Sequence, residues 1–430
     1  MIGLYLFIIA LFALFIGYPI ALTFAGLSLL VGIWIEGVEL FSFIPYRLFD
    51  AIMKNTILMA IPMFIFMGIV LQKTGLAERL LESMGKLFGK RPGGVAISTI
   101  IVGAFLAAST GVVGASVVAM GVISLPVMLK YKYDQRLATG VICASGTLGQ
   151  IIPPSIILII LGDVMGVPVG DLFKAAVVPG FVLVGLYLIY VLLISHVKKD
   201  IAPPIPIDEE NRSELIKNAL FNIIPPLVLI VAVLGSILAG IATPTESSAL
   251  GAVGALILAK IYGKLQLPMI SDSAKETVKV SSMVFAVLIG ATAFSMVFTY
   301  SGGDYIVEEF MRGLPGEKWT FIALAMISIF ILGFFIDFVE IAFIVVPILY
   351  PIAENMGIDM TWFAIIIAMN LQSSFMTPPF GFSLFYLKGV APPEIKTTTI
   401  YKGVIPFILI QLFVVLMLIF IPEYLGFAKF

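Results

Sequence analysis

The sequence is poor in the residues that hold metal ions and disulfide bridges. Its 430 residues include a single cysteine, Cys143, and a single histidine, His196. One cysteine cannot form an internal disulfide, and one cysteine with one histidine is too small a set for the usual zinc sites. The sequence also contains no HExxH pattern and no Walker phosphate-binding motif, which argues against a zinc protease and against an ATP-driven pump. We therefore expect no enzyme activity and no bound cofactor.

Charged residues are scarce as well. Only 12% of the residues are charged and 60% are hydrophobic, whereas about a quarter of the residues in a soluble domain are charged. The 25 basic and 26 acidic residues give a net charge of −1, so the chain lacks the basic surface that nucleic-acid binding requires. A mean hydropathy of +1.13 excludes a soluble protein and a protein with a single membrane anchor. The composition predicts a polytopic integral membrane protein.

Long apolar runs take the place of the missing charges. They are continuous and about 20 residues long, the length at which a helix crosses a hydrocarbon core of about 30 Å. Strands of a β-barrel would instead alternate apolar and polar residues over short segments, so we expect an all-α protein. The first run lacks a basic segment before it and a cleavage site after it, and we expect it to be a retained helix. The predicted spans are 3–17, 20–36, 52–72, 136–163, 173–196, 221–241, 245–262, 281–300, 362–387 and 403–421.

Two further apolar stretches, 93–128 and 319–350, are interrupted near their centres by small and polar residues. Ala107 to Gly114 interrupts the first stretch, and Gly333 to Glu340 interrupts the second. Backbone that is not helical at membrane depth must lie in protein or water rather than in lipid. We therefore predict two re-entrant hairpins. The alternative is two ordinary crossings per stretch, which would also return the chain to its starting side.

The charges that flank these stretches predict their orientation. Segments 73–91 and 130–136, on either side of the first hairpin, are rich in lysine and arginine. Segments 301–318 and 351–361, on either side of the second, are rich in acids. By the positive-inside rule the first pair is cytoplasmic and the second pair external. The hairpins are then expected to enter from opposite faces, with both chain termini on the periplasmic side.

A hydrophilic, proline-containing linker at 197–220 divides the chain into two similar halves, 1–196 and 221–430. Pro153-Pro154 in the first half aligns with Pro378-Pro379 in the second at an offset of 225. Other prolines and a glycine repeat at offsets between 221 and 227: Pro126 with Pro347, Pro179 with Pro406, Pro19 with Pro244, and Gly26 with Gly251. Each half then has five crossings and one hairpin. Because five is odd, the second half is predicted to be inverted relative to the first, with the linker in the cytoplasm.

Each half also contains a segment in which apolar residues recur on one helical face. In 73–91 the apolar face includes Leu76, Leu80 and Met84, while Glu78 and Lys86 lie elsewhere on the helix. This pattern is typical of an amphipathic helix at the membrane surface. The segment 303–314 repeats the pattern in the second half. We expect two arms, one cytoplasmic and one external, each linking a moving unit to a fixed one.

The paired prolines are predicted to break the helices 136–163 and 362–387. Proline cannot donate a backbone hydrogen bond and disfavours helical geometry at the residue before it. Carbonyl groups upstream of each pair should therefore be free, beside the hydroxyls of Ser145 and Thr147 in the first half. Ligands that are all oxygen suit a hard cation such as Na⁺. The simpler interpretation is a proline kink whose backbone groups are satisfied by neighbouring helices.

Ionisable groups at membrane depth indicate function unless shown otherwise. Asp337 and Glu340 lie at the second hairpin tip, and we expect an ion-binding or substrate-binding role, with a solvated tip as the alternative. For the remaining polar residues of interest we expect structural roles: Asp163 as an interfacial acid, Glu246 as a helix cap, His196 as an interfacial side chain and Cys143 as a packing residue.

The motifs described so far resemble one known family. They run from Ser109-Thr-Gly through Gly149-Gln-Ile-Ile-Pro-Pro-Ser to Gly333-Phe-Phe-Ile-Asp and Met376-Thr-Pro-Pro-Phe-Gly. Together they resemble the large membrane subunit, the M or DctM-type component, of tripartite ATP-independent periplasmic (TRAP) transporters, over essentially the whole chain. The resemblance implies an elevator-type Na⁺/organic-anion symporter of the bacterial inner membrane. It also implies two partners, a small four-helix Q subunit and a periplasmic binding protein that delivers the substrate. Because the chain begins directly with its first predicted helix, we expect the Q subunit to be a separate chain.

The resemblance further implies where the sites lie. Carried onto this chain, the first Na⁺ site maps to the first hairpin tip and the first helix break: Ser109, Thr110, Gly111, Ser145, Gly146, Thr147 and Pro153. The second Na⁺ site maps to the second tip and break: Gly333, Asp337, Ser373, Thr377 and Pro378. Residues expected to contact the substrate are Ser155, Glu340, Asn370 and Gln372.

Family substrates are carboxylates, including C4-dicarboxylates, sialic acid and other sugar acids, and keto acids, and no feature of this chain chooses among them. The competing interpretations are a proton-coupled organic-anion transporter that works alone and a channel. A channel would need a continuous polar lining, whereas the polar groups here cluster at two breaks and two tips. An intramembrane protease would need a catalytic set that the sequence lacks.

Overall fold

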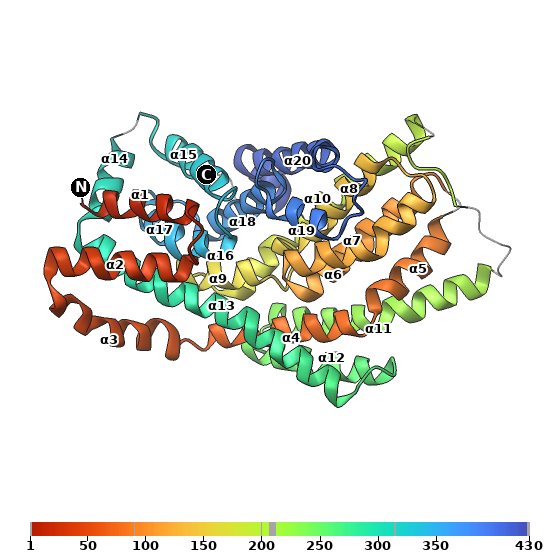
Figure 1. Ribbon diagram of the computed structural model, residues 1–430, viewed down its shortest axis with the longest axis horizontal. Coiled ribbons are helices and arrows are strands. Elements are labelled where there is room, and N and C mark those ends of the chain that lie inside the picture. The colour runs from red at the N-terminus through yellow and green to blue at the C-terminus, as the bar shows by residue number, and fades with distance from the viewer. Residues whose placement is uncertain (1, 90, 199, 206–211, 314, 428–430) are drawn as a thin grey trace.

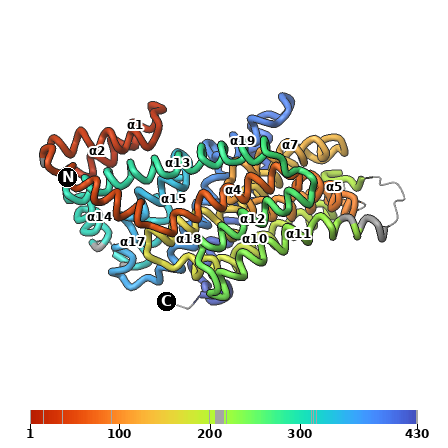
Figure 2. Tube along the Cα trace, turned by 90° about the horizontal axis from the view of Figure 1, so that it is seen from below, coloured from red at the N-terminus to blue at the C-terminus, as the bar shows by residue number. Residues whose placement is uncertain are grey.

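The computed structural model describes residues 2–89, 91–198, 200–205, 212–313 and 315–427. These residues form helices joined by turns, and none of them lies in a β-strand, so the predicted all-α class is confirmed. The molecule is elongated, and its long helices run roughly along its long axis (Figure 1). Helices α1 (Ile2–Phe15) and α2 (Ile20–Glu36) lie at one end, and α5 (Leu76–Phe88) lies towards the other (Figure 2).

The other helices follow in the same order in both halves. The first half continues with α3 (Ile44–Leu48), α4 (Ala60–Lys73), α6 (Gly94–Thr110), α7 (Val113–Lys130), α8 (Gln135–Thr147), α9 (Ile156–Met165) and α10 (Val169–Val197). The second half has α11 (Arg212–Leu238), α12 (Pro244–Ile261), α13 (Leu267–Tyr300), α14 (Gly303–Arg312), α15 (Glu317–Leu332), α16 (Phe338–Glu340), α17 (Val346–Asn355), α18 (Met360–Met376), α19 (Phe382–Val390) and α20 (Thr397–Phe420). A π-helical segment, η5 (Ile341–Val345), joins α16 to α17.

The packing repeats between the halves as the element order does. Helix α4 packs along α12, and their counterparts α13 and α2 pack along each other. The helix that follows each break packs on the hairpin of the opposite half: α9 contacts α17, and α19 contacts α7. The two halves therefore interlock: the hairpin and broken helix of one half pack against those of the other half, and the two sets do not form separate units.

Six helices of the described residues are long and apolar enough to cross a membrane, or seven if the bent pair Val38–Met53 and Ile57–Lys73 is one span. Two of the six, α7 and the segment Phe338–Asn355, are the second arms of the predicted hairpins. The sequence predicted ten spans. Four of the ten predicted spans are among these six helices, in α10, α11, α13 and α20. The breaks account for two of the others, because α8 with α9 and α18 with α19 are pairs of shorter helices, and α1 and α2 are also shorter than 18 residues.

Three helices extend beyond the predicted spans. The predicted span 52–72 is preceded by helical residues from Val38 onwards, with a bend of 61° between the two segments. Helix α13 begins at Leu267 and not at 281, and α11 begins at Arg212, inside the predicted linker 197–220. In each case a helix continues through polar residues outside the apolar run, because backbone hydrogen bonding does not end where hydrophobicity does.

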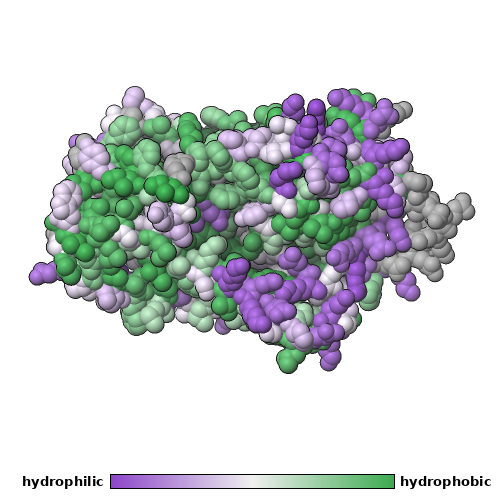
Figure 3. All heavy atoms as spheres, viewed as in Figure 1, coloured by the Kyte–Doolittle hydropathy of each residue, from purple (hydrophilic) through white to green (hydrophobic). Residues whose placement is uncertain are grey.

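Hydrophilic residues gather over one end of the molecule, towards which α5 and the start of α11 lie (Figure 3). The basic segments that sequence analysis assigned to the cytoplasm flank α6 and α7 at this end. The opposite end, with α1 and α2, is covered mainly by apolar side chains (Figure 3).

The two predicted arms are helical. In α5 the apolar residues Leu76, Leu80 and Met84 are buried, and the helix packs on both α6 and α11. The side-chain amide of Asn222 in α11 donates to the Ser83 hydroxyl of α5 at 2.8 Å. In the second half α14 contacts α13, α1 and α15. Each arm thus packs on the first helix of the opposite half, α11 for α5 and α1 for α14. Each also packs on the first helix of the hairpin that it precedes, α6 for α5 and α15 for α14.

Candidate functional site

The first hairpin turns at Gly111. Helix α6 ends at Thr110, Gly111 has a φ of 61°, and α7 begins at Val113. A positive φ of this size favours glycine because a Cβ would meet the following backbone. A Cβ here would also lie 3.1 Å from Ile156, the first residue of α9. The tip of the first hairpin is therefore in contact with the far side of the first helix break.

The first helix break lies between α8 and α9, where the sequence predicted it. Helix α8 ends at Thr147, a single 3₁₀ turn covers Leu148 to Gln150, and α9 begins at Ile156. The backbone of Gly149 lies so close to α6 that a Cβ would be 2.7 Å from the carbonyl oxygen of Ala107. The structure thus packs the C-terminal part of α6 along the first break: Gly103 faces Ser145, Ala107 faces Gly149, and Gly111 faces Ile156.

The hydroxyls at this junction are buried and already donate hydrogen bonds. Ser109 donates to the carbonyl of Leu106 at 2.8 Å, and Thr147 donates to that of Ala144 at 2.9 Å. The Ser145 hydroxyl donates to Ile142 at 3.2 Å. A hydroxyl has one donor hydrogen and two acceptor lone pairs. Since donation uses only the hydrogen, the oxygen lone pairs remain available to a cation.

The second hairpin and break have the same relation. Helix α15 ends at Leu332, and a Cβ on Gly333 would overlap the Ser374 side chain of α18. The Ser373 hydroxyl donates to the carbonyl of Met369 at 3.0 Å, and Thr377 donates to that of Ser373 at 2.7 Å. Helix α18 ends at Met376, just before Pro378, and α19 begins at Phe382.

A serine bridges each break. Ser155 donates to the carbonyl of Gln150 at 2.6 Å, and Ser383 donates to that of Phe375 at 2.9 Å. In both cases the carbonyl lies three residues before the first of the two prolines, whose shared peptide bond is cis. The sequence predicts free carbonyls upstream of the prolines, but the carbonyls of Gln150 and Phe375 both accept hydrogen bonds. Sequence analysis did not single out Ser383, because its partner lies across the proline pair.

The two acids of the second tip differ in their surroundings. Asp337 is the N-cap of α16, and its carboxylate accepts from the backbone N–H of Phe338 at 2.6 Å. Glu340 is 4% exposed, and its Oε2 atom has no hydrogen-bond partner among the described residues. A buried polar atom without a partner costs free energy, so this Oε2 atom is a candidate for binding a ligand.

Three buried amide side chains lie in or before the breaks. Asn370 donates to the carbonyl of Met326 at 2.7 Å and so joins α18 to α15. Gln372 and Gln150 are both buried, and neither amide oxygen nor amide nitrogen has a partner among the described residues. Sequence analysis did not single out Gln150, although it stands within the Gly-Gln-Ile-Ile-Pro-Pro motif; its burial was not visible from the sequence.

The residues expected to have structural roles lie as follows. Glu246 forms a capping box with Thr243, and Cys143 is buried with its sulfur 3.8 Å from the carbonyl of Ser383. The ring Nδ1 of His196 lies 2.8 Å from the carbonyl of Leu192. Asp163 accepts a hydrogen bond from Asn55, which sequence analysis did not anticipate. The described residues contain no group of three or more His, Cys, Asp or Glu side chains that could hold a metal ion.

Comparison with known proteins identifies relatives over nearly the whole chain. The family model described as "Tripartite ATP-independent periplasmic transporter, DctM component" matches residues 7–424. Over 414 residues the chain is 32% identical to the isethionate TRAP transporter permease protein DctMQ of Oleidesulfovibrio alaskensis; this covers 96% of the chain and 64% of that protein's length. Over 378 residues it is 31% identical to the C4-dicarboxylate TRAP transporter large permease protein DctM of Pseudomonas aeruginosa, covering 87% of the chain and 86% of the relative.

Two more comparisons extend this result. The sialic acid TRAP transporter large permease protein SiaM of Vibrio cholerae is 27% identical over 409 residues, covering 94% of the chain and 93% of the relative. Among solved structures, the YdaH transporter of Alcanivorax borkumensis, described as having an unusual topology, matches with a TM-score of 0.63 and covers 90% of both chains. Since its identity is 13%, this likeness shows the fold alone.

Proposed function

Since the chain belongs to the DctM component family of tripartite ATP-independent periplasmic transporters, we propose that it is the large permease subunit of a Na⁺-coupled importer of organic acids. The observation that carries the proposal is the repeated contact between a hairpin tip and a broken helix. Each contact gathers buried or half-buried hydroxyl oxygens whose hydrogens are already donated. Oxygen lone pairs held in fixed positions are what a hard cation requires.

The first proposed Na⁺ site lies between the tip of α6 and the end of α8, with ligands from Ser109, Thr110, Gly111, Ser145, Gly146, Thr147 and Pro153. The second lies between the end of α15 and the end of α18, with ligands from Gly333, Asp337, Ser373, Thr377 and Pro378. The dipoles of the helix ends at each break support these positions, because a helix C-terminus carries a partial negative charge.

The proposed substrate is an organic acid, since relatives are named for C4-dicarboxylate, sialic acid and isethionate transport. We place its contacts at Ser155, Glu340, Asn370 and Gln372, between the two breaks. Gln372 supports this position best, because its buried amide has two donors and an acceptor without partners among the described residues. These relatives are named for different acids, so the substrate-binding protein would determine which acid is transported.

We propose the partners and location from the family's description. A tripartite transporter has three components, so a small four-helix membrane subunit and a periplasmic substrate-binding protein would complete it, in the bacterial inner membrane. An elevator motion is supported by the interlocked packing of α6–α9 with α15–α19, which would move as one unit. Helices α2, α4, α12 and α13 pack along one another and would form the fixed part.

Uptake by proteoliposomes tests the proposal. The chain is reconstituted with its two partners, and uptake of succinate, sialic acid or isethionate is measured with and without an inward Na⁺ gradient. We expect uptake of at least one acid only with the gradient. Equal uptake driven by a pH gradient without Na⁺ would instead support the proton-coupled alternative, in which Asp337 and Glu340 carry the coupling. Flux of the acid that needs neither the Na⁺ gradient nor the pH gradient, and that does not saturate as the acid concentration rises, would indicate a channel.

A further inference from the structure

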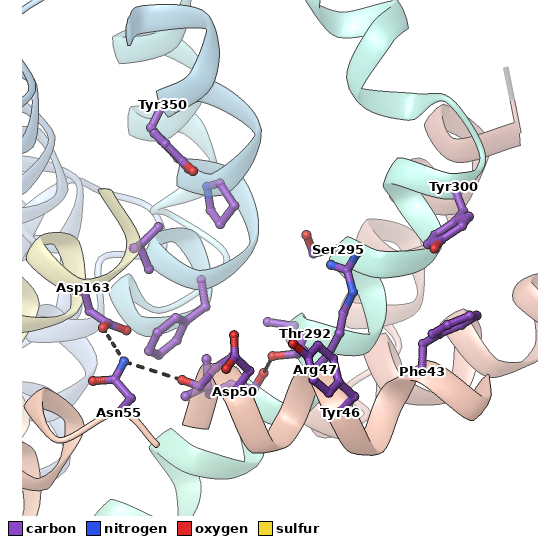
Figure 4. A pocket seen from close by; sticks show the side chains of 16 residues that line it. Phe43, Tyr46, Arg47, Asp50, Asn55, Asp163, Thr292, Ser295, Tyr300 and Tyr350 are labelled. Atoms are coloured by element: carbon purple, nitrogen blue, oxygen red, sulfur yellow. Dashed lines mark hydrogen bonds between the residues drawn. The ribbon is translucent and has the colours of Figure 1, made fainter. Parts of the chain in front are cut away.

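A polar cavity of about 660 Å³ lies beside the second arm of the second hairpin (Figure 4), and its lining includes none of the residues of the two proposed Na⁺ sites. One wall comes from the helical residues before the 61° bend, which precede α4, and from α13; α4 and α13 belong to the proposed fixed part. The other wall comes from α9, η5 and α17 of the proposed moving unit. The polar lining residues are Tyr46, Arg47, Asp50, Asn55, Asp163, Thr292, Ser295, Tyr300 and Tyr350.

The acids of this cavity are already paired, whereas its arginine is not. Asp50 forms an ion pair with Lys54 at 3.2 Å, and Asp163 accepts a hydrogen bond from Asn55. Arg47 has no ion pair and no hydrogen bond among the described residues. Figure 4 shows its side chain extending from the helix towards Ser295 of α13. The cavity therefore presents a guanidinium group whose charge no neighbouring carboxylate in the described residues takes up.

Several hydroxyls of the lining are also open. Ser295, Tyr300 and Tyr350 make no hydrogen bond to the described protein, and they surround the space into which Arg47 extends (Figure 4). Ligand sites in proteins have volumes of about 300–1,000 Å³ and a few convergent polar groups. The size and the lining thus match a small, polar, negatively charged molecule.

The cavity adjoins the residues proposed to bind substrate. Phe343, which lines it, lies one helical turn after Glu340. A smaller cavity of about 170 Å³ lies towards the other end of α13, beside Thr110 of the first hairpin tip, with Lys279 in its lining. The inverted repeat relates these two positions, since each lies between a hairpin and the same pair of long segments. Of these two repeat-related cavities, the one beside the second hairpin is wide, at about 660 Å³, and the one beside the first hairpin is narrow, at about 170 Å³.

We propose that the wide cavity is an access subsite at which Arg47 pairs with the carboxylate or sulfonate group of the organic acid before the acid reaches the breaks. This inference rests on the proposed function. Arginine suits the task because its planar, permanently charged group can form two parallel hydrogen bonds to an oxyanion. The hydroxyls of Ser295, Tyr300 and Tyr350 then serve the polar body of the acid.

Thiol chemistry at Ser295 tests the charge of the cavity without any substrate. In S295C, we compare the reaction rates of a negatively charged sulfonatoethyl and a positively charged trimethylammonioethyl methanethiosulfonate at low ionic strength. We expect the ratio of anionic to cationic rates to fall about fivefold when R47Q is added, because one nearby charge acts on both reagents with opposite sign. The native Cys143 is fully buried, so the unsubstituted protein serves as the blank. An unchanged ratio would overturn the proposal.

Uptake kinetics test the role of the subsite. In R47Q we expect KM for the transported acid to rise about fivefold, about 1 kcal/mol, with the half-saturating Na⁺ concentration unchanged and R47K closer to wild type. The matched control is K174Q, since Lys174 lines a different cavity beside Asp171. An equal rise of KM in both variants would show general charge steering and overturn the subsite, as would wild-type KM in R47Q. If the wild-type transporter takes up none of the acids, the proposed function fails instead, and the reagent ratio still decides the charge of the cavity.

Discussion

Replacing one hydroxyl at each break by a methyl group gives the sharpest test of the paired Na⁺ sites. Thr147 is fully buried, and its Oγ1 donates to the carbonyl of Ala144 at 2.9 Å. Thr377 is half-buried, and its Oγ1 donates to the carbonyl of Ser373 at 2.7 Å. Valine has nearly the shape of threonine, so Thr147→Val and Thr377→Val each remove one proposed oxygen ligand and leave the prolines and helix ends in place.

The expected magnitude follows from the loss of one buried polar contact, which costs about 1–3 kcal/mol. Each 1.4 kcal/mol is a factor of ten in affinity, so the apparent Na⁺ affinity should fall about five- to 150-fold. We expect Thr147→Val to lie in the upper part of this interval because that hydroxyl is fully buried. Thr377→Val should lie in the lower part, since water can replace part of the lost contact at a half-buried position.

The measurement is the Na⁺ concentration that gives half-maximal uptake in proteoliposomes. The matched control is Thr99→Val, because Thr99 is fully buried in α6 and donates to the carbonyl of Val95 at 2.8 Å, about three helical turns from the hairpin tip. Thr99→Val should lower the melting temperature as much as Thr147→Val and leave the Na⁺ dependence unchanged. The reasoning would be refuted if both test variants kept wild-type Na⁺ dependence while Asp337→Asn abolished uptake, since coupling would then belong to the acids of the second hairpin.

Three further predictions concern packing, topology and partners. Gly149→Ala should destabilise the protein by about 1–3 kcal/mol and reduce uptake, since its Cβ would lie 2.7 Å from the Ala107 carbonyl oxygen. Thermal unfolding measures this effect, and the control Gly185→Ala, where a Cβ meets no atom within 4 Å, should keep the wild-type melting temperature. Asp200→Cys, at an exposed position after α10, should resist an impermeant maleimide in intact cells and react after lysis, and labelling from outside would contradict the inverted topology. The purified chain without a small membrane subunit and a binding protein should show no Na⁺-driven uptake of free substrate, and robust uptake by the chain alone would contradict the tripartite assignment.

The sequence by itself determined the class of the protein and the outline of its repeat. Hydrophobic runs are a property of composition, so the all-α membrane fold followed from them without any knowledge of packing. The proline pairs at 153–154 and 378–379 act on the backbone next to them, and for that reason both helix breaks were found at the expected positions. The turn at Gly111 is local in the same way. The family was identified from these motifs and is confirmed by the match over residues 7–424.

Helix ends outside the apolar runs were not determined locally. Helix α13 extends back to Leu267 through Asp272, Lys275 and Glu276. Hydropathy reports where a helix can meet lipid, whereas a helix continues wherever its backbone bonds and tertiary contacts favour it. The contact of Lys73 in α4 with Glu276 at 3.2 Å is one of the tertiary contacts that the hydropathy pattern does not contain.

Only the tertiary structure decided which polar groups meet. Gln150 and Gln372 are buried without partners in the described chain because helices from both halves cover them, and burial depends on neighbours that are far away in sequence. Ser383 reaches Phe375 across the second proline pair. Arg47 stands in a helical stretch that hydropathy did not predict, and its cavity exists only because α13, α9 and α17 close around it. Long-range packing places these groups, and a single sequence records the groups but not their distances from one another.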